Sequence, residues 1–219
     1  MTDATTWIAA IATVAILTLY EVTLLLAKRR HPERLARVAH RTLREDWFLA
    51  VSAMPGSEIL AVQTLRNSLM SASMTASTAV LGLMGTVTLT IPSLQEGFGA
   101  VGSGAPHFTP RLALELVLLA LLFASLVSAV MAVRYYNHAG FIVGTPVASA
   151  ARQRWMSQGT VYVRRAGLLY SWSIRHLVLV VPIVAFLLHP WAGPLGAVVV
   201  VAVLFSFDRF DPSRTEPPA

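Results

Sequence analysis

The residues best able to do chemistry are polar side chains inside or beside long apolar runs. Glu21 lies within the first of these runs, about 9 Å along a helix from its last apolar residue, Ala27. A carboxylate at that depth is costly unless it is paired or functional. We therefore expect Glu21 either to form an ion pair that docks helices, with Arg66, Arg134 or Arg175, or to serve a transport pathway.

A line of polar side chains recurs at near-helical steps in and just before the second apolar run. In a transporter such a line faces the pathway. In any helical bundle it can equally be hydrogen-bonded packing, worth about 0.6 kcal/mol per bond. Both interpretations apply to Gln63, Asn67, Ser71, Thr75 and Thr78.

A third group combines guanidinium groups with hydrogen-bonding side chains near the predicted cytoplasmic ends of three spans. Glu21 is the acid expected nearby, so most of the positive charge would lack a partner. Guanidinium binds phosphate or carboxylate oxygens bidentately, which predicts an anion or lipid-headgroup site. Alternatively, each arginine extends separately to the headgroups. The candidate residues are Arg66, Asn67, Arg134, Tyr135, Asn137, His138, Arg175 and His176.

Recognisable catalytic machinery is absent from the sequence. It has no Walker loop, metalloprotease histidine motif, nucleophile elbow or cysteine. The histidines lack metal-ligand spacing, and a metal shared by His138 and His176 is a weaker explanation than interfacial hydrogen bonding. Glu115 lies near the outer end of the third run, where we expect it to be solvated. We expect no enzyme, no cofactor and no metal.

Long apolar runs must position these groups. Of the 219 residues, 55% are hydrophobic and 13% are charged, whereas soluble domains carry about 25% charged residues. The net charge of +6 comes from cations beside the spans, which disfavours a nucleic-acid partner. We predict an all-α fold, a polytopic helical membrane protein with about five transmembrane helices plus cytoplasmic amphipathic helices. The apolar runs are residues 5–27, 65–92, 112–133, 173–188 and 195–207.

The predicted organisation alternates spans with basic segments. We expect a first transmembrane helix, a cytoplasmic basic amphipathic helix, a membrane domain with four further spans that includes a basic cytoplasmic segment, and a mobile cytoplasmic tail. In that order these are residues 1–30, 31–57, 58–207 with 138–175 inside it, and 208–219.

Three details of this organisation follow from residue type. Trp47 and Phe48 place the amphipathic helix either at the membrane interface or against the protein itself. The second span is rich in small residues, which predicts a helix at the centre of the bundle. The last two apolar runs are short, so they form thin or tilted spans or a re-entrant hairpin.

The distribution of lysine and arginine sets the orientation. These residues number eight in 28–66, six in 134–175 and two in 208–219, but none in 93–110 or 189–194. The positive-inside rule makes the first three segments cytoplasmic. We therefore expect a bacterial inner (cytoplasmic) membrane protein with its N-terminus outside and its C-terminus in the cytoplasm.

Three stretches resemble a bacterial and plant membrane-protein family known as domain of unknown function 599. They are AVQTLRNSLM at 61–70 with ASTA at 76–79, RYYNHAGF at 134–141, and the segment from Arg165 to Trp191. The resemblance covers roughly residues 47–207, and its most specific element is Gln-Thr-Leu-Arg-Asn. It implies an all-helical membrane domain and transfers no activity, substrate or catalytic residue.

The sequence favours an oligomeric channel or transporter for a small ion or solute, with an anion preferred. One copy offers only four or five thin spans, so we expect a homo-oligomer. The alternative is a non-transporting membrane scaffold or lipid-organising subunit. The expected partners are membrane lipids, chiefly anionic ones, and further copies of the chain. A pathway requires polar side chains that face water at bilayer depth, whereas a scaffold predicts that they are buried against neighbouring helices.

Overall fold

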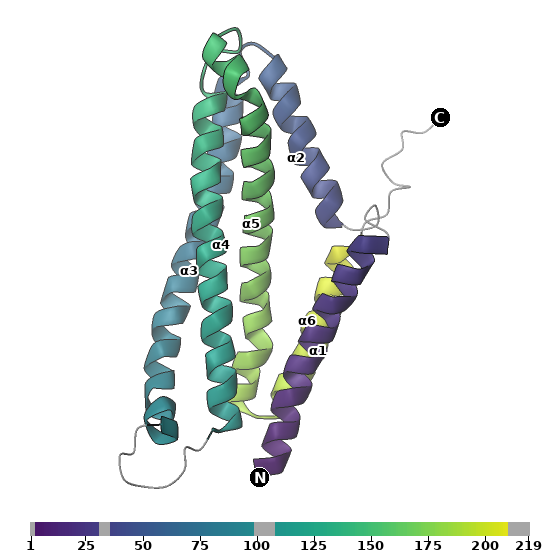
Figure 1. The fold of residues 1–219 in the computed structure, drawn as a ribbon, viewed down its shortest axis with the longest axis vertical. Coiled ribbons are helices and arrows are strands. Elements are labelled where there is room, and N and C mark those ends of the chain that lie inside the picture. The colour runs from purple at the N-terminus through teal and green to yellow at the C-terminus, as the bar shows by residue number, and fades with distance from the viewer. Residues whose placement is uncertain (1–2, 31–35, 99–107, 210–219) are drawn as a thin grey trace. The chain divides into compact units, whose positions relative to one another are not determined.

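The computed structural model describes residues 3–30, 36–98 and 108–209, and its elements are six α-helices (Figure 1). The predicted all-α fold is therefore confirmed. The predicted tail, apart from residues 208 and 209, lies outside the described residues. The helices are α1 (Asp3–Arg30), α2 (Ala36–Ala53), α3 (Glu58–Phe98), α4 (Pro110–Val143), α5 (Ala150–Leu188) and α6 (Ala192–Asp208).

Four of these helices are long and apolar enough to cross a membrane. They are α3, α4, α5 and the part of α1 from Asp3 to Ala27. The apolar helix α6 has 17 residues, which makes it about 25 Å long against a hydrocarbon core of about 30 Å. The chain is thus a helical membrane protein with four long candidate spans and one shorter apolar helix.

Helix boundaries differ from the prediction where polar sequence continues a helix. α4 runs to Val143 and α5 begins at Ala150, so most of the predicted segment 138–175 is helical. The run 173–188, expected to be a short span, is the end of the 39-residue α5. α3 likewise continues through Pro92. Hydropathy identifies only the part of a helix that is apolar enough for lipid. The helical hydrogen bonds continue beyond that part, because the polar turns that follow contain Arg, Gln and Ala, which have high helix propensity.

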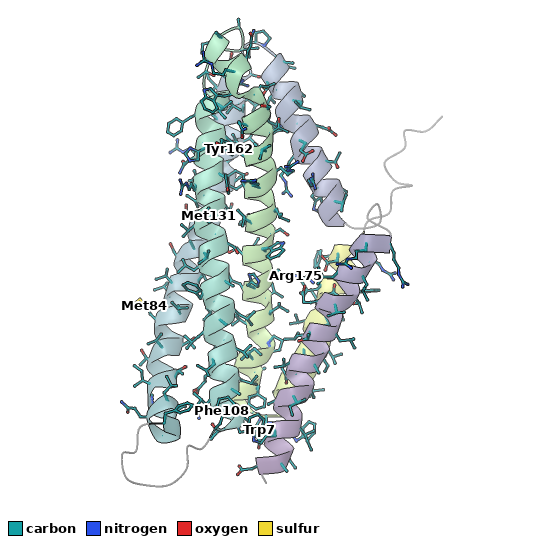
Figure 2. The ribbon with its side chains drawn as sticks, viewed as in Figure 1. Trp7, Met84, Phe108, Met131, Tyr162 and Arg175 are labelled. Atoms are coloured by element: carbon teal, nitrogen blue, oxygen red, sulfur yellow. The ribbon has the colours of Figure 1, made fainter. Side chains whose placement is uncertain are left out.

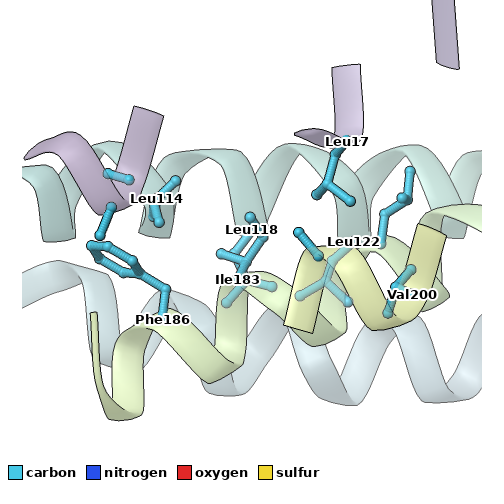
Figure 3. Packing of buried hydrophobic residues seen from close by; sticks show 11 residues of the cluster. Leu17, Leu114, Leu118, Leu122, Ile183, Phe186 and Val200 are labelled. Carbon is cyan, nitrogen blue, oxygen red and sulfur yellow. The ribbon is translucent and has the colours of Figure 1, made fainter. Parts of the chain in front are cut away.

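The chain divides into two compact units, and α3, α4 and α5 contribute to both. The first unit contains α1, α6 and the parts of the other helices within residues 79–124 and 175–209. Its apolar core joins side chains from α1, α4, α5 and α6 (Figure 3). The labelled core residues are Leu17, Leu114, Leu118, Leu122, Ile183, Phe186 and Val200.

Helices α1 and α6 pack side by side within the first unit. A Cβ at Gly193 would lie 2.6 Å from Thr13 Oγ1, so the glycine permits close approach at the start of α6. At the other end of α6, Asp208 accepts a hydrogen bond of 2.7 Å from the Tyr20 hydroxyl. The two helices therefore run in the same direction.

The second unit contains α2 and the parts of α3, α4 and α5 within residues 33–78 and 125–174. α2 docks on α5 through Phe48, whose ring lies against Gly159, and through Arg44, which lies against Gly167. Ser52 accepts a 3.0 Å hydrogen bond from α5 as well. Phe48 is completely buried, which supports the second of the two alternatives, an α2 that packs on its own protein. Two glycines of α5, Gly159 and Gly167, leave room for these α2 side chains.

Candidate functional site

The polar line on α3 lies on a face that the described chain leaves largely uncovered. Gln63, Asn67, Ser71 and Thr78 are exposed, and Thr75 is half-buried. The hydroxyls of Ser71, Thr75 and Thr78 donate to backbone carbonyls one turn earlier, at 3.1, 2.9 and 3.0 Å. These three bonds stay within α3 and do not join it to another helix.

The opposite face of α3 does the packing. Ala79, Thr86 and Thr90 are buried, and a Cβ at Gly82 would lie 3.0 Å from Leu122 Cδ2 on α4. Only 17% of the most apolar window of α3 is buried, against 28–33% in the other candidate spans. The prediction that α3 lies at the centre of the bundle is therefore wrong for a single chain. Its small residues fall on two faces, and only one of these contacts neighbouring helices.

Arg175, which is labelled in Figure 2, is the centre of an ionic network in the first unit. Its Nε donates to Glu21 Oε1 at 2.6 Å and its Nη1 donates to Asp208 Oδ2 at 2.8 Å. The Tyr20 hydroxyl donates to the same Asp208 oxygen, and the guanidinium carbon lies 5.4 Å from the Tyr20 ring centre. The expected pairing of Glu21 with one of three arginines is confirmed, with Arg175 as the partner.

Asp208 and Tyr20 are the members of this network that sequence reasoning missed, and Asp208 is the charged one. It was assigned to the mobile tail, but it is the last residue of α6. Its carboxylate gives Arg175 a second acid, so two carboxylates contact one guanidinium group. The only sequence signal was an acid directly after an apolar run.

The eight residues of the predicted anion cluster fall in both units. Arg175 and His176 belong to the first unit, and the other six belong to the second. Within the second unit Tyr135 is half-buried, and the side chains of Arg66, Asn67, Arg134, Asn137 and His138 are exposed.

Aromatic rings and one further arginine surround Tyr135 in the second unit. The Tyr162 ring centre lies 5.7 Å from that of Tyr135 and 5.6 Å from that of His138. Arg165 donates from Nη1 to the Tyr135 hydroxyl at 3.3 Å, and its guanidinium carbon lies 5.8 Å from the ring centre. Sequence reasoning missed Tyr162 and Arg165, because they come from α5 and only tertiary packing brings them to α4.

Arg152 is almost wholly buried and was expected only as a topology signal. Its Nη1 donates to the Ile142 and Thr145 carbonyls at 2.6 and 3.3 Å, and its Nη2 donates to Ser52 Oγ at 3.0 Å. Carbonyls at a helix end have no partner inside the helix. Arg152 satisfies those at the end of α4, a structural role.

Glu115 is fully buried, so its expected solvation was wrong. Its Oε1 accepts a 2.9 Å hydrogen bond from Arg111, which is exposed. Helix α4 turns this acid inward, and the arginine one turn earlier reaches the surface. No three His, Asp or Glu side chains gather as metal ligands in the part of the chain that the structure describes, and His138 and His176 lie in different units.

Residues 8–213 match the family described as "Protein of unknown function, DUF599". No curated protein and no solved structure matches the chain.

Proposed function

The chain belongs to the DUF599 family, and we propose that it is a homo-oligomeric channel or transporter for a small ion or solute. In this proposal the exposed polar face of α3 lines the path between copies. The observation that carries it is the exposure of Asn67, Ser71 and Thr78 on a helix apolar enough to span a membrane.

Lipid is a poor environment for this face. The hydroxyls satisfy themselves on the α3 backbone, but the amide groups of Gln63 and Asn67 need water or another polar partner. Arg66 is exposed one position before Asn67 and adds positive charge at one end of the line. Water and a passing solute would meet these needs, and the arginine favours an anion.

The proposed topology has five crossings. In the first unit α6 runs parallel to α1. A helix that packs in parallel along a membrane span crosses in the same direction as that span, whereas a re-entrant segment would end on the side of the membrane where it began. The parallel packing therefore supports counting α6 as a short fifth span. Five crossings put the two termini on opposite sides of the membrane, and the arginine distribution then places the N-terminus outside and the C-terminus in the cytoplasm of a bacterial inner membrane.

The test combines flux with the accessibility of single cysteines. The chain has no native cysteine, so Ser71→Cys and Thr78→Cys report on α3 alone, and Val127→Cys on an exposed position of α4 serves as control. We expect both α3 cysteines to react with a membrane-impermeant thiol reagent in proteoliposomes, and Val127→Cys to stay unreactive. The reagent should also block flux through the two α3 variants.

The alternative function is a non-transporting scaffold or lipid-organising subunit. In that case a second copy covers the α3 face and excludes water. No flux would then occur with anions, cations or protons, and the α3 cysteines would form a disulfide between copies without reacting with the reagent. That pair of results would contradict the transport proposal.

A further inference from the structure

An open pocket of about 380 Å³ lies between α4 and α5 in the second unit. Its volume is within the range of small-molecule sites, about 300–1,000 Å³. The lining residues are His138, Phe141, Ile142, Thr145, Ala151, Trp155 and Tyr162.

Aromatic side chains dominate this lining. Phe141 is 76% exposed and Trp155 is 50% exposed, so two large apolar rings beside the pocket lack full cover. The Tyr162 ring is tilted against His138 at 5.6 Å. Rings with free faces and edges bind other flat rings by offset or edge-to-face stacking.

The surroundings of the pocket are positively charged. Residues 125–174 contain five arginines and no acid. On α4, Arg134 precedes His138 by one turn, and on α5, Arg165 follows Tyr162 by one turn. Both arginines are exposed.

Among the residues that the structure describes, neither Arg134 nor Arg165 forms a salt bridge with an acid. Glu45 on α2 pairs with Arg41 at 3.1 Å and lies 3.7 Å from Arg164. Glu58 on α3 accepts the Val147 backbone N–H, beside the turn between α4 and α5. An anion near Arg134 and Arg165 would therefore meet uncompensated positive charge.

We propose that this pocket binds a small aromatic organic anion. Its ring stacks against Trp155, Tyr162 and Phe141, and its carboxylate or sulfonate binds the guanidinium groups of Arg134 and Arg165. Binding here does not depend on transport, so the site is equally compatible with a regulator or a solute. A phosphate-bearing lipid lacks the flat ring that the lining suits.

The proposal is tested by calorimetric titration of 2-naphthoate into the purified full-length protein in detergent. Heats measured with empty micelles are subtracted. Two further ligands separate the contributions: 2-naphthalenemethanol keeps the ring without the charge, and acetate keeps the charge without the ring. We expect 2-naphthoate to bind about tenfold more tightly than either, because a charge-assisted hydrogen bond and ring burial each contribute that much. Equal binding of acetate, or binding of phosphatidylglycerol without any binding of 2-naphthoate, would overturn it.

Two pairs of variants locate the site. Arg165→Gln should weaken 2-naphthoate binding about tenfold, whereas Arg209→Gln removes an exposed arginine of the first unit and should leave it unchanged. Trp155→Ala should likewise weaken binding, and Trp172→Ala should not. Arg165→Lys, which restores the charge, should recover part of the affinity and shows that the fold is intact. Wild-type affinity in both Arg165→Gln and Trp155→Ala would overturn the proposal.

Discussion

Ser125 on α4 and Ser173 on α5 bind each other's backbone reciprocally. The Ser125 hydroxyl lies 2.9 Å from the Ser173 carbonyl, and the Ser173 hydroxyl lies 2.8 Å from the Ser125 carbonyl. The two hydroxyl oxygens are 3.0 Å apart, and both residues are completely buried. Such contacts require the two backbones to approach closely, which small residues permit.

Replacing either serine with a larger residue should therefore lower the free energy of unfolding more than replacing it with alanine, which only removes a hydrogen bond. Ser173→Ala should lower the free energy of unfolding by about 0.6 kcal/mol, whereas Ser173→Leu should lower it by about 2 kcal/mol through overpacking. Denaturant unfolding in detergent measures both. Ala120→Leu, at an exposed position of α4, is the control, and an equal effect of all three changes would contradict the close contact.

Arg175→Gln should destabilise the first unit, because it leaves Glu21 and Asp208 without their shared cation. We expect a loss of about 2 kcal/mol, less than for a fully buried pair since the Glu21 side chain is 36% exposed. Adding Glu21→Gln and Asp208→Asn should recover part of it. Arg209→Gln, at an exposed neighbour of Asp208, should have little effect. Unchanged stability of Arg175→Gln would refute the role of the network.

Gly82 and Ser77 should respond differently to leucine, since they occupy opposite faces of α3. Gly82→Leu collides with Leu122 and should lower the unfolding midpoint of the chain. Ser77 is exposed, so Ser77→Leu should leave that midpoint intact and weaken self-association, as measured by light scattering after size exclusion. Loss of folding in both variants would show that the chain itself buries both faces.

Gly159→Leu should displace α2, because its side chain would occupy the space of the Phe48 ring. Ser52→Cys is a suitable reporter, since Ser52 is 3% exposed in the docked helix. We expect maleimide to label this cysteine several times faster in the Gly159→Leu background. Gly140→Leu, where a Cβ meets open space, should leave the rate unchanged. Equal labelling rates would mean that α2 does not depend on this contact.

The topology follows from reporter fusions that are active only outside the cytoplasm. Fusions after Gly99 and Gly193 should give signal, and fusions after Ser57, Ala150 and Ala219 should be silent. The reason is that five crossings place all the arginine-rich segments on one side. A strong signal from the Ala219 fusion would instead make α6 a hairpin.

The sequence by itself determined the class of molecule and the location of its apolar helices. Length and apolarity decide whether a helix is stable in hydrocarbon, and these are local properties that 5–27 and 112–133 carry in their own residues. The polar line of α3 could also be predicted from local sequence, because helical spacing alone places Asn67, Ser71 and Thr78 near one face of the helix.

Only the tertiary structure decided which side chains meet. The sequence offered three arginines as partners for Glu21, and the structure pairs it with Arg175. Asp208 also pairs with Arg175, because α6 packs along α1. The same holds for Phe48 against Gly159, which depends on the register between α2 and α5. Such pairings arise from contacts between segments distant in the chain, and the periodicity of one helix carries no information about its register against another.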